Sequence, residues 1–396
     1  MTPPMDSPAT TTLDLAPPAR STQATAEGRF IYIAVPWTPM GGGMYKVADY
    51  LIQAQLEGAQ GPVLRPLDTR GSGSAAASLV QVMRAVGQLA RAKFAGRVAG
   101  VHVNMAERLD FVRESIVLVA CKLLRIPAVL HLHAAQLHHS YREFPAPLRA
   151  LVRWIFSLPQ SCVVLGQVSA DFVTRELRVP PERVEIVING VPQPKAARRT
   201  ERPAVPRVLF VGNLSERKGV PELLEALAQP ALARVPLELT LAGGGDIAGY
   251  AEQARQLGVA GKVDFHGWAT QEQVEHLLSQ ADVLVLPSHD EGLPLAILEA
   301  LAHGVAVVCT PVGEIPHVLS HGHTACFVEP GAPASIARGL AQVLTDAQLR
   351  ERLERKGQAL HQAQFSLRHF AASIARIHQR MFGLSAQLPA ESEELR

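Results

Sequence analysis

The chain has 396 residues, of which 47% are hydrophobic, and its 38 basic side chains nearly balance its 36 acidic ones. This length is too great for one ordinary core and suits two domains. The small net charge gives no general attraction to nucleic acid, so no nucleic-acid partner is expected.

Residues 1–28 are rich in Pro, Thr and Ala and have neither a basic start nor an apolar run. They are expected to form a disordered tail and not a signal peptide. No stretch of about 18 apolar residues occurs, so no membrane span is expected. The four cysteines are widely spaced in apolar runs, which predicts buried free thiols and a cytoplasmic protein.

From Arg29 onwards, short β-branched runs alternate with helical stretches of a dozen or more residues. The runs are RFIYIAV, RVAGVHVN, PAVLHLH, SCVVLG and RVEIVIN, then RVLFVGN, LELTLAGGG, KVDFHGW, ADVLVLPS, AVVCTP and ACFVEP. Runs that are apolar on both faces suit a parallel sheet covered on both sides by helices. The sequence therefore predicts two doubly wound α/β domains.

Between the two sets of runs, residues 191–206 are rich in Pro, Arg and Ala and have no apolar periodicity. The expected domains are residues 29–200 and 201–365. A final amphipathic helix is expected at residues 366–383 and is predicted to return to the first domain. Residues 384–396 are expected to form a flexible tail.

Glycines follow the first predicted strand, in PWTPMGGGMYKVADYL. Gly41, Gly42 and Gly43 open a helix there, where backbone N–H groups can approach an anion. A tight strand–helix turn without a ligand explains them equally well. They do not fit the G-x-G-x-x-G pattern of dinucleotide-binding domains.

Histidines gather at the end of another predicted strand, in HLHAAQLHH. Alternation puts His131 and His133 on one face of that strand. No carboxylate or cysteine accompanies them at ligand spacing, so no metal site is expected. His133 is the candidate for contact with a substrate hydroxyl or with developing charge, and a structural histidine is the alternative.

Arg217 and Lys218 come just before a helix in RVLFVGNLSERKGVPELLEAL. Two cations beside a helix N-terminus suit a diphosphate. A solvated basic loop is the commoner role of such a pair and stays open as the alternative.

Glu291 and Glu299 lie eight positions apart in a segment that indicates strand, loop, helix and strand. Glu291 is expected at the end of the loop, at the mouth of the helix, and Glu299 within the helix. Eight residues make a little over two helical turns, so Glu299 is expected on roughly the same helix face as Glu291. Backbone N–H groups at Gly292 and Leu293 would point at an anion, and Glu299 could take two ribose hydroxyls. A core ion pair of Glu299 and a hydrolase acid–base pair are the alternatives; burial of one member in a helix disfavours the latter.

These residues, in this order, resemble the glycosyltransferases of family 4, which have the GT-B fold. The resemblance covers Arg29 to about Phe382. It is strongest in PSHDEGLPLAILEALAHGVAVVCTPVGEIPHVL, which is similar to the E-x7-E region and G-x-P turn of the family, and VGNLSERKGVPELLEAL, VEIVINGVP and FHGW match further motifs. The resemblance implies two Rossmann-like domains that face a central cleft. It also implies a retaining transfer of sugar from a nucleotide-sugar donor, a UDP-sugar or GDP-sugar, with no metal or other cofactor.

By match to the family, Lys218 would contact the donor diphosphate and Glu299 the ribose. Glu291 would hold hydroxyls of the donor sugar, His133 would lie beside that sugar, and Gly43 would offer a backbone amide to the phosphate. The catalytic candidates are therefore His133, Glu291 and Lys218.

The resemblance also places the base of the donor against backbone near Gly267 and Trp268. The residues expected to bind the donor are Gly42, Gly43, Asn213, Arg217, Lys218, Gly267, Trp268, Glu291, Gly292, Leu293 and Glu299.

Two departures from the family pattern are present. Asn213 stands where the family often has Arg, and Arg217 is the candidate to compensate for it. In the turn that often reads G-G-I-P-E, this chain has Glu314 and His317 in place of the second Gly and the final Glu. These departures put the usual contact at that turn in doubt.

Family members of this type commonly build exopolysaccharide or other bacterial surface glycans on lipid-linked acceptors. The segment APLRALVRWIF, with Arg149, Arg153 and Trp154, could rest on an anionic membrane together with Lys122 and Arg125, or could be an ordinary amphipathic helix. The expected partners are a nucleotide-sugar and a glycan or lipid-linked acceptor. A transferase for a small soluble acceptor and a catalytically silent nucleotide-sugar-binding subunit are the alternatives.

Overall fold

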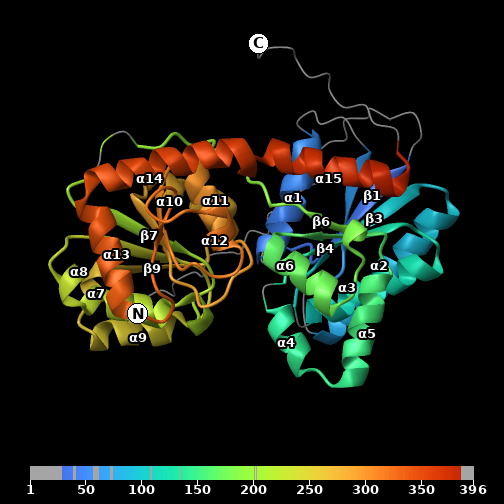
Figure 1. Ribbon diagram of the computed structural model, residues 1–396, viewed down its shortest axis with the longest axis horizontal. Coiled ribbons are helices and arrows are strands. Elements are labelled where there is room, and N and C mark those ends of the chain that lie inside the picture. Colours follow the sequence, from blue (N-terminus) through green and yellow to red (C-terminus); the bar gives the residue numbers. More distant parts are fainter. Residues whose placement is uncertain are drawn as a thin grey trace, which may run out of the picture.

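The computed structural model describes residues 29–38, 42–56, 62–71, 75–107, 109–134, 136–199, 201 and 203–384. Two six-stranded parallel sheets form two α/β domains that lie side by side (Figure 1). The two expected doubly wound domains are therefore confirmed. The expected tail at residues 1–28, all but the first residue of the expected tail at 384–396, and Gly41 lie outside the described residues.

The first sheet has the strand order β2-β1-β3-β4-β5-β6, and every pairing in it is parallel. Its strands are β1 (Phe30–Val35), β2 (Val63–Asp68), β3 (Val98–Met105), β4 (Ala128–Leu132), β5 (Ser161–Val164) and β6 (Val184–Ile186). Its helices are α1 (Gly42–Leu56), α2 (Ala75–Phe94), α3 (Leu109–Leu123), α4 (Leu137–Glu143), α5 (Ala146–Ser157) and α6 (Gln167–Asp171), which continues into a π-helical turn (Phe172–Glu176).

Helices cover both faces of the first sheet, as alternation along β1 requires. Ile31 and Ile33 pack in one hydrophobic cluster with Val47 of α1. Ala34, which points to the other face, packs in a second cluster with Leu89 of α2 and with side chains of α3 and α5. The layer formed by α2, α3 and α5 is thus separated from α1 by the sheet.

Strand β2 is the one strand of the first sheet that the sequence did not predict. Arg65 and Pro66 interrupt its apolar pattern, and it forms the edge of the sheet with half of its residues exposed. An edge strand tolerates both residues because only one side of its backbone is paired.

The second sheet has the order β12-β11-β10-β7-β8-β9 and is also parallel throughout. Its strands are β7 (Arg207–Val211), β8 (Glu238–Ala242), β9 (Val263–Gly267), β10 (Val283–Leu286), β11 (Ala306–Cys309) and β12 (Cys326–Phe327). Its helices are α7 (Val220–Ala228), α8 (Pro230–Ala233), α9 (Ile247–Gln256), α10 (Gln271–Gln280), α11 (Leu295–Ala302), α12 (Ile315–Val318), α13 (Pro333–Thr345) and α14 (Ala347–Leu360).

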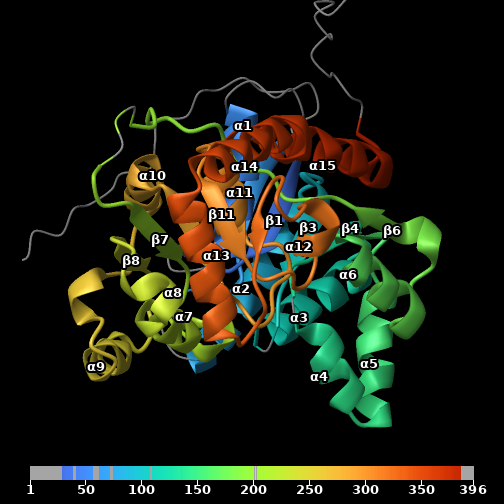
Figure 2. The same cartoon turned by 60° about the vertical axis from the view of Figure 1, so that its left-hand side comes forward.

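The last helix, α15 (Leu367–Phe382), leaves the second domain and packs on the first, against α1, β3 and β4 (Figures 1 and 2). Gly100 of β3 allows this close approach, because a side-chain carbon there would collide with the ring of Phe382. Next to the start of α15, Val191 pairs with Ser366, so the chain crosses between the domains twice at one place. The predicted return of the final helix is confirmed.

Candidate functional site

The loops after β7, β10 and β11 pack on one another at the carboxyl edge of the second sheet. Gly219, at φ +71°, lies so close to Pro287 that a side-chain carbon would collide with the carbonyl oxygen of Pro287. Gly313, at φ +58°, approaches the carbonyl of Glu291 in the same way. Only glycine combines this backbone conformation with such contact, and the packing brings Lys218 to Glu291.

Lys218 and Glu291 form a buried ion pair, with Nζ and Oε1 2.5 Å apart. Ser288 donates its hydroxyl to the same carboxylate oxygen at 2.7 Å. Two of the three residues predicted to be catalytic are thus in contact, and a cation and an acceptor stand together at the edge where α/β sheets bind ligands.

The other predicted diphosphate ligands lie further out. The side chain of Arg217 is exposed, and its Nη1 donates to the carbonyl oxygen of Asp290 at 2.9 Å. Asn213 is also exposed. Arg217 therefore fixes the loop that carries Glu291, while Lys218 is the cation within it.

Glu299 lies in the second turn of α11 and faces the first domain. The hydroxyl of Tyr50 donates to its Oε1 at 2.9 Å, and Nζ of Lys46 lies 3.0 Å from the same atom. Burial and the neighbouring carboxylate raise the pKa of Tyr50. The ion-pair alternative for Glu299 is thus observed, and its partner is α1 of the other domain.

The expectation that Glu291 and Glu299 share a helix face is wrong. Helix α11 begins only at Leu295, so Glu291 lies in the preceding loop and helical periodicity does not relate the two. They line different cavities: Glu291 lines one between the domains, and Glu299 lines one beside residues 192–195, α1, α10 and α11.

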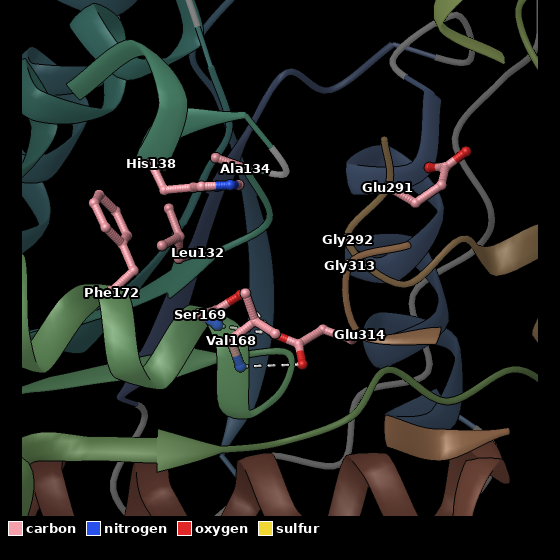
Figure 3. A pocket seen from close by; sticks show the side chains of 10 residues that line it. All are labelled: Leu132, Ala134, His138, Val168, Ser169, Phe172, Glu291, Gly292, Gly313 and Glu314. Carbon is pink, nitrogen blue, oxygen red and sulfur yellow. Dashed lines mark hydrogen bonds between the residues drawn. The ribbon is translucent and has the colours of Figure 1, made fainter. Parts of the chain in front are cut away.

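The cavity between the domains has walls from both of them (Figure 3). The second domain contributes its loops around Glu291 and Glu314. The first domain contributes the end of β4, His138 of α4 and the region of Ser169 in α6. In Figure 3 the carboxylate of Glu291 points away from the residues of the first domain, as its ion pair with Lys218 requires.

Glu314 crosses this cavity and joins the domains. Its carboxylate accepts the backbone N–H groups of Val168 and Ser169, at 3.3 and 2.9 Å, and the hydroxyl of Ser169 at 3.0 Å. The residue is 1% exposed. The sequence singled out Glu314 as a departure from the family pattern but gave no partner for it.

His133 turns toward the interior of the first domain, while its neighbours Leu132 and Ala134 line the cavity. Its Nε2–H donates to Oδ1 of Asn104 at 2.9 Å, and the amide nitrogen of Asn104 donates to the carbonyl oxygen of Ala34. Burial lowers the pKa of His133 to about 3, so its imidazole is neutral. The hydrogen bond to Asn104 fits the structural-histidine alternative, while His133 itself is only partly buried.

Three further buried histidines form a chain behind His133. His102 hydrogen-bonds His378 of α15 at 2.9 Å and His131 at 3.2 Å, and the ring of His131 lies 4.0 Å from that of His133. Burial is the main reason why the pKa of each of these three histidines is lowered. Among the described residues, no group of three or more histidines, cysteines and carboxylates is arranged to hold a metal ion.

Four other residues that were predicted to bind the donor lie at two further places, the start of α1 and the end of β9. Gly42 and Gly43 are exposed, and a side-chain carbon at Gly43 would lie 3.9 Å from Leu295, so the start of α1 faces the start of α11. Gly267 and Trp268 follow β9, and Trp268 is 47% exposed. None of these four residues lines either of the two cavities.

The family model described as "Glycosyl transferases group 1" matches residues 194–360. This match covers the second domain, with Lys218, Glu291, Glu299 and Glu314.

Two curated relatives are glycosyltransferases. The chain is 34% identical to a D-inositol 3-phosphate glycosyltransferase of Thermobispora bispora, over 54% of this chain and 56% of the relative. It is 35% identical to the lipopolysaccharide core biosynthesis glycosyltransferase LpsE of Rhizobium meliloti, over 41% of this chain and 46% of the relative. The chain spans about half the length of these relatives.

A solved structure of Anabaena Alr3699/HepE in complex with UDP and glucose superposes with a TM-score of 0.69 at 17% identity, over 89% of this chain and all of that chain. This similarity shows a shared fold, and the GT-B architecture expected from the sequence is confirmed. Among the described residues, no helix is both long and apolar enough to cross a membrane.

Proposed function

We propose that this protein is a retaining family 4 glycosyltransferase that moves a sugar from a nucleotide-sugar donor to a glycan acceptor. The observation that carries the proposal is the buried pair of Lys218 and Glu291 at the carboxyl edge of the second sheet. Glu291 lines a cavity between the domains, and the pair lies in the segment that matches glycosyltransferases.

Lys218 and Glu291 would bind different parts of the donor. A diphosphate beside Nζ of Lys218 would become its partner and leave the carboxylate of Glu291 to hydroxyls of the sugar. As the bond from the anomeric carbon to the diphosphate breaks, Lys218 stabilises the charge that gathers on the leaving phosphate. The acceptor oxygen forms the new bond on the same face and gives its proton to that phosphate.

The ribose of the donor would bind at Glu299, next to the larger cavity. A vicinal diol can replace the hydroxyl of Tyr50, which donates to Oε1 of Glu299, because the hydroxyls of a diol also donate to carboxylate oxygens. The base would then lie toward Gly267 and Trp268. UDP-sugars and GDP-sugars are the donor classes that we propose, and the Anabaena protein is a relative in fold that was solved with UDP.

For the acceptor, we propose a lipid-linked glycan of a bacterial surface polysaccharide, used in the cytoplasm by a protein in peripheral contact with the membrane. The relative LpsE, whose name refers to lipopolysaccharide core biosynthesis, favours this acceptor class. A small phosphorylated acceptor is the second candidate, because the other relative is named for D-inositol 3-phosphate. A silent nucleotide-sugar-binding subunit is disfavoured by the intact Lys218–Glu291 pair.

Calorimetric titration with UDP, GDP, ADP and their sugar conjugates tests the donor site. We expect one nucleotide to bind, and Glu299→Ala to weaken that binding at least tenfold, while Glu351→Ala on the exposed face of α14 leaves it unchanged. Absence of binding by every nucleotide at millimolar concentration would contradict the proposed donor site. Binding without turnover on any acceptor would favour the silent subunit.

A further inference from the structure

The exposed apolar side chains of the molecule gather on one layer of the first domain. Among the residues that the structure describes, nine of the fourteen large hydrophobic side chains that are exposed belong to α2, α3 and α5. They are Leu79, Val80, Met83, Phe94, Leu109, Val112, Leu123, Leu151 and Trp154. We name these nine side chains the outer face, because the three helices turn their opposite sides to the sheet.

The outer face is continuous from helix to helix. Helix α2 contacts α3, and α3 contacts α5. The last turns of α2 and α3 also lie side by side, since Nζ of Lys93 donates to the carbonyl oxygen of Arg125 at 3.1 Å. Phe94 and Leu123, at the ends of these helices, are 85% and 78% exposed and are the two most exposed large apolar side chains described.

Helical spacing aligns the apolar side chains with cations. On α2, positions Met83, Arg84, Arg91 and Phe94 fall within one sector of about 100° at 100° per residue, and all four are exposed. On α3, the exposed Lys122 adjoins Leu123. The arrangement is that of a helix that lies in a membrane interface, with apolar side chains inserted and cations at the headgroups.

Acidic residues are few on the helices that build this face. Helices α2 and α5 contain no Asp or Glu, and α3 contains Asp110, which pairs with Arg113, and Glu114, which is fully buried. The charge along the outer face is therefore positive, although the whole chain carries only +2. Apolar side chains among cations fit the headgroups and acyl boundary of an anionic bilayer, and each cation near such a surface strengthens binding.

The exposure of the side chains moves the proposed membrane contact away from the α5 segment that the sequence suggested. Arg153 of α5 is half-buried, and its Nε donates to the carbonyl oxygen of Glu176. Arg149 is half-buried too, whereas Trp154 is 48% exposed. The surface that offers apolar and basic groups together is centred on α2 and α3 and reaches α5 only at its edge.

We propose that the outer face binds an anionic membrane surface, with α2 and α3 lying along it and Phe94 and Leu123 inserted between the headgroups. Docking would bring the protein to the lipid-linked acceptor of the proposed function, and in that respect the inference rests on the proposed function.

Co-sedimentation of the full chain with vesicles tests the docking. We expect binding to phosphatidylcholine vesicles that contain phosphatidylglycerol, at least tenfold weaker binding to phosphatidylcholine alone, and loss of binding at high salt. Phe94→Ser/Leu123→Ser should lower the partition about tenfold by removing the inserted groups. Arg91→Glu/Lys122→Glu should lower it at least as much.

Matched controls separate the outer face from general changes in hydrophobicity and charge. Ile186→Ser/Val205→Ser removes exposed apolar side chains elsewhere, and Arg355→Glu/Lys356→Glu reverses two exposed charges on α14. Both should bind vesicles like the unaltered chain. No binding to the anionic vesicles, or equal loss in the variants and the controls, would overturn the proposal.

The same variants should bind the donor nucleotide with unchanged affinity in calorimetry, which also shows that they are folded. Loss of vesicle binding with intact nucleotide binding supports the docking surface. Vesicle binding by a chain that binds no nucleotide would overturn the proposed function and leave the docking surface standing. The two failures are therefore distinguishable.

Discussion

The carboxylate of Glu314, in the second domain, accepts the backbone N–H of Ser169, in the first domain, at 2.9 Å. Val168 and the hydroxyl of Ser169 donate to the same carboxylate, which is almost completely buried. Gly166 leaves the space for it, because a side-chain carbon there would collide with Glu314. The contact spans the cavity and joins the two domains where their loops meet.

Glu314→Ala should therefore favour an opened arrangement of the domains. The change removes hydrogen bonds to a charged group, which contribute about 2 kcal/mol. We expect a larger radius of gyration in small-angle X-ray scattering and faster proteolysis between the domains.

Glu329→Ala, an exposed glutamate of the same domain, serves as the control and should leave both readouts unchanged. If Glu314→Ala scatters like the unaltered chain, the remaining contacts between the domains hold them closed without Glu314. The Tyr50–Glu299 contact is the first of these to examine.

Lys218 and Arg217 should differ in their effect on nucleotide binding. Nζ of Lys218 lies inside the site against Glu291, whereas the guanidinium of Arg217 is exposed and holds the carbonyl of Asp290. We expect Lys218→Ala to weaken binding of the nucleoside diphosphate about tenfold to a hundredfold, the loss of one charged hydrogen bond or slightly more. Arg217→Ala should weaken it only severalfold.

Calorimetric titration measures both effects, and Arg255→Ala on α9 is the control for removal of an exposed cation. A loss at Arg217 as large as that at Lys218 would mean that Arg217 contacts the phosphate directly. It would then take the role of the arginine that Asn213 replaces in this chain.

The folds of the two domains could be predicted because most strands are indicated by their own short run of apolar residues. The run VLVL of β10 is buried at every position, and such a run has few other structures available. Strand β2, with Arg65 and Pro66 in its middle, gives no such signal. Lys218 and Glu291 were found for a related reason: each lies in a loop after a strand, and the carboxyl ends of parallel strands meet at one edge.

The contacts between the domains could not be predicted in this way. Glu299 was expected to bind the ribose of the donor. Its observed partner, Tyr50, lies 249 positions away on a helix of the other domain. Glu314 and Ser169 are likewise 145 positions apart. No spacing within a segment encodes such pairs, because they depend on how two finished domains approach each other.

Tyr50→Phe should tighten nucleotide binding while it destabilises the fold. The hydroxyl of Tyr50 donates to Oε1 of Glu299, the carboxylate proposed for the ribose. Its removal frees that oxygen for the diol, and we expect the affinity to rise about threefold to tenfold. The free energy of unfolding should fall by about 1 to 2 kcal/mol, because a buried hydrogen bond to a charged group is lost.

Titration of the nucleotide and urea denaturation measure the two effects on one preparation. Tyr141→Phe is the control, since it removes the hydroxyl of another buried tyrosine, which donates to the carbonyl of Glu176. Nucleotide binding that is unchanged by Tyr50→Phe would mean that the ribose does not use Glu299.

The buried histidines predict that acid weakens the fold. Burial lowers the pKa of His102 to about 3 and those of His131 and His378 well below 6.5, the ordinary value. In the unfolded chain these three histidines therefore take up protons as the pH falls below about 6.5, whereas in the folded chain burial keeps them neutral well below that pH. Stability is full above 6.5 and falls as the pH drops below it, by up to about 1.4 kcal/mol per pH unit for each such histidine.

His378→Leu isolates the contribution of one histidine, because it removes one proton uptake and leaves every carboxylate in place. We expect the slope of the unfolding free energy against pH to fall by about one proton between about pH 6 and pH 4. At neutral pH the variant should lose about 1 kcal/mol, because His102 loses its partner on α15.

Urea denaturation at several pH values measures this slope, and His276→Gln is the control, since that histidine is exposed on α10. A slope that is equal in His378→Leu and the control would mean that His378 is protonated in the folded chain as readily as in the unfolded one. Water would then have to reach the interface between α15 and the first sheet, and the histidine chain would be a solvated contact instead of part of the core.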